Sequence, residues 1–190
     1  MPNVFDVLSK DHVEVEQALA ELESGPTAAT GADPEQKEIR KRLVEQLIIE
    51  ESKHEAVEEE YFWPAVRDKL PDGDHLADEA TDQEQAAKHI LNDLLDLDPD
   101  DPRFEDRLRT FTVDGREHIA YEEERVWPRM REALSAKEAD ELGTKVEEGK
   151  KLAPTRPHPN TPPRPGILKT VGKAAAVADR ARDAVTGLGD

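Results

Sequence analysis

Two pairs of a histidine and a glutamate, His54 with Glu58 and His118 with Glu122, have the spacing that lets two side chains hold one metal ion. The members of each pair stand four residues apart, so on a helix they lie one turn apart on the same face. One imidazole nitrogen and one carboxylate oxygen can then converge on a single ion. The spacing alone is a weak signal, because 44 of the 190 residues are acidic and it also occurs elsewhere in the chain.

An internal repeat distinguishes these two pairs from the others. Residues 54–70 and 118–134 are identical at nine of 17 positions, at an offset of 64 residues. Two helices with equivalent roles around a pseudo-twofold axis would give this pattern. In each copy a Trp-Pro pair begins nine residues after the histidine. Because proline disfavours helical geometry at the preceding residue, we expect each helix to kink or loosen there.

The elements that must position these residues are helices. Apolar residues recur with the period of amphipathic helices, and strand patterns are absent. The predicted helices span about 3–24, 35–69, 74–97 and 103–134. Four such helices bury their apolar stripes best as an antiparallel, up-down-up-down four-helix bundle, so the predicted fold class is all-α, with residues 1–134 as the bundle.

Three shorter segments follow the predicted bundle. Residues 135–152 predict an additional short helix, which begins at the capping box Ser135-Ala136-Lys137-Glu138. Residues 153–166 predict a stiff Pro-rich linker, since 154–165 contain six prolines. Residues 167–190 predict a C-terminal amphipathic tail helix, which could dock on the bundle, self-associate or bind a protein partner.

Composition excludes several classes of function. Residues 1–150 hold 19 Lys and Arg against 41 Asp and Glu, a net charge of −22, which would repel the phosphates of a nucleic acid. The absence of cysteine excludes disulfides and thiolate metal sites. No apolar run approaches the ~20 residues of a membrane helix, and the first residues lack the layout of a signal peptide. We therefore expect a soluble, cytoplasmic protein that binds neither nucleic acid nor membrane.

Counting along the predicted bundle brings two more histidines level with the repeat. His54 lies 16 residues before Leu70, and His89 lies 16 residues after Gly73, so these histidines are level in an antiparallel hairpin. His12 takes the missing position in the apolar stripe of the first helix. The predicted metal ligands are His12, His54, Glu58, His89, His118 and Glu122.

Four histidines and two glutamates exceed the needs of one tetrahedral zinc ion. They fit two metal ions, each with two histidines, bridged by the two carboxylates. Imidazole with carboxylate suits iron, manganese or zinc, and two bridged redox metals suit dioxygen or peroxide. Tyr61 and Tyr121 lie within a turn of the glutamates and could donate to bound peroxide or ligate iron, although packing is their simpler role. The candidates for residues that orient the ligands are Glu16, Glu51, Glu59 and Glu123.

The order of these motifs over about residues 3–134 resembles the hemerythrin-like (HHE cation-binding) family, in the variant common among actinobacterial members. The resemblance implies a four-helix bundle with a non-heme centre of two iron ions joined by an oxo or hydroxo bridge. It implies His12 and His54 on one iron, His89 and His118 on the other, and Glu58 and Glu122 as bridges.

The chain departs from the oxygen-carrying hemerythrins of marine invertebrates, which have a fifth histidine where this chain has Asp93. Their last bridge is an aspartate at the position of Glu123. The missing histidine implies more open metal positions, which favour reaction with peroxide, dioxygen or nitric oxide. The resemblance to related bacterial proteins implies catalase-like activity, oxygen sensing, or a role in iron or redox homeostasis. Two alternatives stay open: a metal store or a gas or redox sensor without turnover, and a metal-free helical interaction scaffold.

Overall fold

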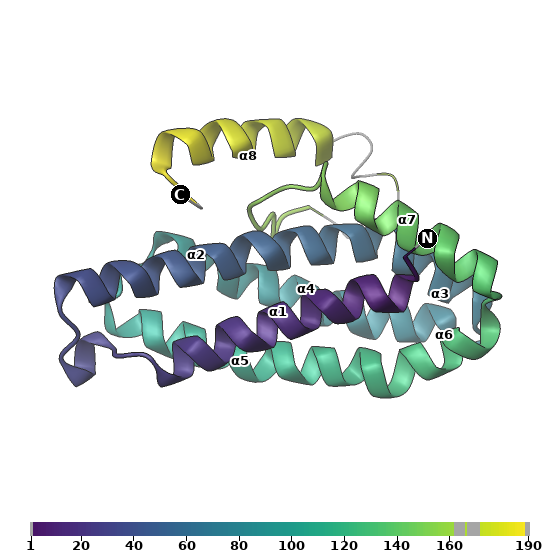
Figure 1. Ribbon diagram of the computed structural model, residues 1–190, viewed down its shortest axis with the longest axis horizontal. Helices are drawn as coiled ribbons and strands as arrows, with labels where there is room; N and C mark the ends of the chain where they lie inside the picture. The colour runs from purple at the N-terminus through teal and green to yellow at the C-terminus, as the bar shows by residue number, and fades with distance from the viewer. Residues whose placement is uncertain (1, 162–165, 167–171, 189–190) are drawn as a thin grey trace.

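The structure is a computed structural model that describes residues 2–161, 166 and 172–188. Four long helical segments form an antiparallel, up-down-up-down bundle (Figure 1), which confirms the predicted all-α class. A single turn of 3-10 helix, η1 (Ala28–Thr30), lies in the first connection. The segments are α1 (Val4–Ser24), α2 (Pro34–Val57) continued by α3 (Trp63–Lys69), α4 (Gly73–Asp96), and α5 (Pro102–Tyr121) continued by α6 (Trp127–Ala133).

The helices α2 and α5 begin where an aspartate side chain accepts one of the first free amide groups. Asp33 accepts from the Gln36 amide at 2.9 Å, and Asp101 accepts from the Arg103 amide at 2.9 Å; a proline follows each of the two aspartates. Proline at the first helical position loses no hydrogen bond, since that amide has no partner within the helix. These caps fix the two ends from which the repeat-bearing helices run towards the centre of the bundle.

The second and fourth segments each contain one π-helical turn, η2 (Glu58–Phe62) and η3 (Glu122–Val126). Each π turn comes directly before a Trp-Pro pair. Proline has no amide hydrogen and its ring clashes with the carbonyl four residues earlier, and a wider turn relieves both problems. The predicted loosening of the helix is therefore confirmed, and it begins at the glutamate of each His-x-x-x-Glu pair.

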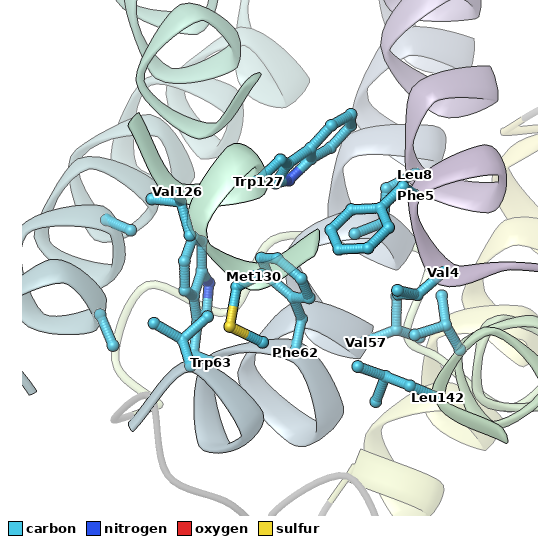
Figure 2. Close-up of a cluster of buried hydrophobic side chains, with 14 of the residues drawn as sticks. Val4, Phe5, Leu8, Val57, Phe62, Trp63, Val126, Trp127, Met130 and Leu142 are labelled. Atoms are coloured by element: carbon cyan, nitrogen blue, oxygen red, sulfur yellow. The ribbon is translucent and has the colours of Figure 1, made fainter. Parts of the chain in front are cut away.

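Two apolar clusters fill the bundle, one on each side of a polar layer. Figure 2 shows the first cluster, in which Phe5 packs between Phe62 and Trp127, with Met130 beside them. The second cluster, towards the other end, contains Leu19, Leu47, Leu91, Phe104 and Phe111. Along α1, His12 lies between Leu8 of the first cluster and Val15 of the second. The candidate ligands thus occupy a layer closed by apolar side chains above and below.

Two further helices cover one side of the bundle. The predicted fifth helix is α7 (Ala136–Lys150), and its glycines allow a close approach: a Cβ atom at Gly149 would lie 2.6 Å from the ring of Tyr61. Figure 1 shows α8 (Lys173–Thr186) on the outer side of α2. Residues 153–161 form no helix, while 162–165 of the predicted linker and 167–171 and 189–190 of the predicted tail helix lie outside the described residues.

The linker and α8 are joined by charged contacts. Arg156 donates to Asp183 at 2.8 Å, and His158 lies 2.9 Å from a carboxylate oxygen of the buried Asp179. None of the helices in the described parts of the chain has the length and apolar character needed to cross a membrane.

Candidate metal centre

Three histidines from three helices turn their Nε2 atoms towards buried glutamates in the polar layer. His12 comes from α1, His54 from the end of α2 and His118 from the end of α5. The His12 and His54 rings meet edge to face with centroids 5.0 Å apart. All three side chains are largely withdrawn from solvent, His12 and His54 almost completely. The arrangement places three imidazole nitrogens where carboxylates can join them.

Three glutamates complete two groups that could each hold a metal ion. The first group is His12, His54 and Glu122; the second is Glu58, Glu84, His118 and Glu122. Within each group one ligand atom per residue lies within 4.8 Å of the others. Glu122 belongs to both groups: its two oxygens lie 3.1 Å from His12 Nε2 and 3.4 Å from His118 Nε2. A carboxylate with one oxygen towards each group has the geometry of a bridge between two ions.

The other nitrogen of each histidine has an acceptor. His12 Nδ1 lies 2.9 Å from Glu123, His54 Nδ1 lies 3.2 Å from Asp11, and His118 Nδ1 lies 2.9 Å from Gln83. Such acceptors place the proton on Nδ1 and leave the Nε2 lone pair free for a metal. Lys150 of α7 in turn donates to Asp11, so a fifth helix reaches the ligand set.

The residues present fit a metal centre because the atoms that would bind it lack other partners. Seven buried atoms of the two groups have no hydrogen-bond partner in the described part of the chain: His12 Nε2, His118 Nε2, both carboxylate oxygens of Glu58 and of Glu122, and Glu84 Oε2. Burying one unpaired polar group costs about 1–3 kcal/mol, and more when it is charged. Cations between these atoms would satisfy them together.

The electrostatics of the metal-free cluster reflect the same crowding. Burial, followed by the charge of Glu122, raises the pKa of Glu58. Burial alone would also raise the pKa of Glu122, but the charges of His118 and His12 outweigh it, so that pKa is lowered. One of the two buried carboxylates therefore holds a proton more readily, which a bound cation would displace.

The prediction that His89 belongs to this cluster is wrong. His89 is exposed on α4, and the inward position is held by the buried Glu84, five residues earlier. Five residues turn a helix by about 140° beyond a full turn, so the two side chains point to different faces.

The two tryptophans of the repeat contact the ligands, a role that sequence reasoning missed. Trp127 stacks on the His12 ring at a centroid distance of 5.0 Å and an angle of 12°. Trp63 donates its Nε1 hydrogen to Glu84. Their placement next to the π turns directs both indoles into the polar layer, where they fix two ligand side chains.

The tyrosines lie away from the cluster. The Tyr121 hydroxyl donates to the Leu76 carbonyl at 3.0 Å, and Tyr61 faces α7 across Gly149. Among the glutamates expected to orient ligands, Glu123 contacts His12, whereas Glu59 pairs with Lys88. Of the other two glutamates, Glu51 lines the cavity beside the histidines, whereas Glu16 pairs with Arg116 on the surface.

A cavity of about 230 Å³ adjoins the cluster between α2, α4 and α5. Its lining includes His12, His54, Glu84 and His118, so it reaches both candidate metal groups. One water molecule takes about 30 Å³ of liquid, so the cavity can hold several small molecules. Both candidate metal groups thus adjoin a space that small reactants can occupy.

Comparisons with known proteins agree with this geometry. The chain is 24% identical over 184 residues to an uncharacterized hemerythrin-like protein of Schizosaccharomyces pombe, covering 96% of this chain and 86% of that protein. It is 26% identical over 148 residues to a DNA nickase of Nostoc, covering 78% of this chain but only 39% of that much longer protein.

A solved structure shares the fold. The crystal structure of a Hemerythrin HHE cation binding domain-containing protein from Mycobacterium kansasii superposes with a TM-score of 0.67 at 23% identity, covering 94% of this chain and 99% of that one. The Hemerythrin HHE cation binding domain family matches residues 3–130, the stretch that supplies every side chain of the two metal groups. The chain therefore belongs to the hemerythrin HHE cation-binding domain family.

Proposed function

We propose that the protein is a non-heme di-iron protein that reacts with peroxide, dioxygen or nitric oxide, with catalase-like disproportionation of peroxide as its activity. The observation that carries the proposal is the shared carboxylate Glu122, which faces a histidine in each of two buried groups whose ligand atoms lack other partners. One ion would be held by His12, His54 and Glu122, and the other by Glu58, Glu84, His118 and Glu122.

Two iron ions, when bound, supply the paired electron transfers that oxidise one peroxide to dioxygen while reducing another to water. The protein's own part is positioning. The Nδ1 acceptors hold each imidazole with Nε2 inward, and Trp127 stacked on His12 limits the rotation of that ring. The cavity brings a small reactant to the open side, where Phe111 and Ile119 form an apolar wall.

The proposal extends to the cellular role and to partners. We propose a cytoplasmic protein that acts in redox or iron homeostasis on small reactants, with α8 as a surface for self-association or a protein partner. Exposed valines on α8, 66% exposed at Val177 and 86% at Val185, support such a surface.

The test is metal analysis of the purified protein, followed by absorption spectra and oxygen release on adding peroxide. We expect about two iron ions per chain, bands of a bridged ferric pair, and oxygen evolution, since two bridged metals fit this ligand set. Two irons with a spectral change but no turnover would instead indicate sensing or storage. No bound metal after reconstitution with ferrous iron would contradict the proposal and leave a helical scaffold.

A further inference from the structure

The opening of the 230 Å³ cavity is bordered by small side chains. Ala86 and Ala87 on α4 and Gly115 on α5 are among the residues that line it. A Cβ atom placed on Gly115 would have only the Phe111 ring within 4 Å among the described residues outside its own turn, at 3.7 Å. Glycine inside a long helix is unfavourable, so its presence here needs a local reason. The space it leaves open leads to the ligand layer.

The exposed charges at this opening are of one sign. Five carboxylates line the cavity, and no lysine or arginine of the described chain is among its lining residues: Glu51, Glu55, Glu84, Asp114 and Glu117. Asp114 and Glu117 are exposed at the mouth, and neither has a salt bridge within the described residues. Arg116 between them points elsewhere, to Glu16 at 3.1 Å and to Glu23 at 2.9 Å. The positive charge nearest in sequence is thus held away from the mouth.

Unpaired atoms at the bottom of the cavity show that the acidic lining leads to a binding site. Glu84 Oε2 and His118 Nε2 are buried, line the cavity and lack hydrogen-bond partners in the described chain. Glu55 lies on the same wall, and its Oε2 atom is 4.0 Å from Lys88 Nζ, so the unpaired ligand atoms here are those of Glu84 and His118. A cation that enters therefore meets further unpaired ligand atoms as it moves inward.

We propose that this opening is a charge-selective access route, through which ferrous iron and uncharged reactants reach the centre while anions are repelled. The inference rests on the proposed di-iron function. Asp114 and Glu117 are its specificity-determining residues, and Gly115 keeps it open. A cleft lined by one sign of charge focuses the field and raises the arrival rate of counter-ions by about 10- to 1,000-fold.

The test measures how fast metal-free protein takes up ferrous iron under anaerobic conditions, as the loss of chelator-accessible iron with time. In Asp114→Asn/Glu117→Gln we expect uptake at low salt to slow by roughly three- to tenfold, since two charges of the focusing field are removed. Asp114→Asn alone gives an intermediate rate. The matched control is Glu147→Gln/Glu148→Gln, two exposed residues of α7 remote from the cavity, which changes net charge equally and leaves the rate unchanged.

An anionic probe should show the opposite change in rate, and this distinguishes charge selection from structural damage. Azide binding to the iron-loaded protein, followed by absorbance, should become faster in Asp114→Asn/Glu117→Gln. A disturbed fold would change both probes in the same direction, and that result would overturn the inference. Raising the ionic strength should bring the wild-type rates towards those of the variant, because salt screens exposed charges.

Larger side chains at position 115 test whether ions pass through this opening. Gly115→Leu should slow ferrous iron and azide alike, without changing the final iron content, whereas Gly115→Ala should keep rates near wild type because its Cβ makes only an ordinary contact. Equal rates in wild type, Gly115→Leu and Asp114→Asn/Glu117→Gln would overturn the access route while leaving the di-iron proposal intact. A wild-type protein that takes up no iron would contradict the di-iron proposal itself.

Discussion

The two copies of the repeat share a backbone but differ in what covers them. Both have a π turn after the histidine and a Trp-Pro pair after that turn. The first π turn lies under α7 and the tail, so Glu60 is only 6% exposed, and its equivalent Glu124 is exposed. Tyr61 of the first turn contacts α7, whereas its counterpart Arg125 is 58% exposed and pairs with Glu79. The identical residues give both copies the same π turn, whereas the neighbouring helices determine how far each copy is exposed to solvent.

The difference reaches the metal ligands through their Nδ1 partners. His54 is bonded to a buried aspartate that is itself paired with Lys150, whereas His118 is bonded to the neutral Gln83. Burial lowers the pKa of both imidazoles, but the carboxylates of Glu58 and Asp11 outweigh it at His54 and raise that pKa well above its usual range. At His118 burial prevails and the pKa is lowered. The repeat thus yields two inequivalent ligands.

The largest expected effect separates Glu122 from Glu58, which occupy equivalent positions in the two copies. Because Glu122 belongs to both metal groups, whereas Glu58 belongs to the second and reaches the first only through His54 at 3.2 Å, Glu122→Gln should lose nearly all bound iron and Glu58→Gln a smaller share. Loss of tightly bound metal lowers the free energy of unfolding by about 3 kcal/mol or more at metal concentrations 100-fold above Kd. Iron content and thermal melting, each with and without chelator, measure this difference.

Metal-free protein provides the control for that prediction. Without iron the Glu122 carboxylate is favoured by the charges of His118 and His12, which lower its pKa, so Glu122→Gln should melt somewhat below chelated wild type. The gain in melting temperature on iron loading should vanish in Glu122→Gln, and a variant that kept this gain would show that Glu122 does not hold the metal.

A smaller effect is expected for Lys150, which serves only the first copy. Lys150→Met leaves the buried Asp11 without its lysine, and we expect about 1–3 kcal/mol of lost stability, below the full cost for a buried pair because Lys150 is partly exposed. Iron affinity at the His54 group should also fall by about 10- to 100-fold, because Asp11 then orients the His54 imidazole less firmly. Differential scanning calorimetry and iron titration measure the two changes.

Two matched variants sharpen the Lys150 prediction. Lys150→Arg keeps the charge and should restore most of the iron affinity, while Lys145→Met removes an exposed lysine of the same helix and should have no effect. Equal losses in Lys150→Met and Lys145→Met would show that the α7 contact does not reach the ligand.

Much of the centre could be predicted from sequence because the repeat marks it. His54, Glu58, His118 and Glu122 stand on apolar stripes in duplicated contexts, and the structure brings them together with His12. Glu84 had a signal that outweighs that of His89: it lies four residues after Ala80 and seven before Leu91, on the inward stripe of α4. An inward acidic residue was overlooked because histidine is the more conspicuous ligand.

The orienting residues could not be predicted from any local pattern. Asp11 and Lys150 are 139 positions apart, and they meet only because α7 folds back on α1. Gln83 is one of several polar residues on α4, and its role depends on the rotation of that helix against α5. Such contacts are products of tertiary structure.

Gln83 allows the second copy to be changed towards the first. Gln83→Leu removes the 2.9 Å contact to His118 Nδ1, which should cost about 1 kcal/mol and lower iron affinity about tenfold. Gln83→Glu supplies a carboxylate like that of Asp11 and should keep or raise the affinity. If both substitutions weakened iron binding equally in a titration, the acceptor at this position would not control the ligand.

The smallest expected effect concerns Gly115, whose equivalent in the first copy is Glu51. Both positions line the cavity, but only the second copy has glycine in the middle of its helix. Gly115→Ala should stabilise the protein by up to about 1 kcal/mol, because alanine is the better helix former and its Cβ would lie 3.7 Å from Phe111. Urea denaturation measures the gain. A loss of stability would mean that α5 depends on glycine for its backbone conformation, whereas a gain would mean that the opening tolerates a methyl group here and that only a larger side chain narrows it.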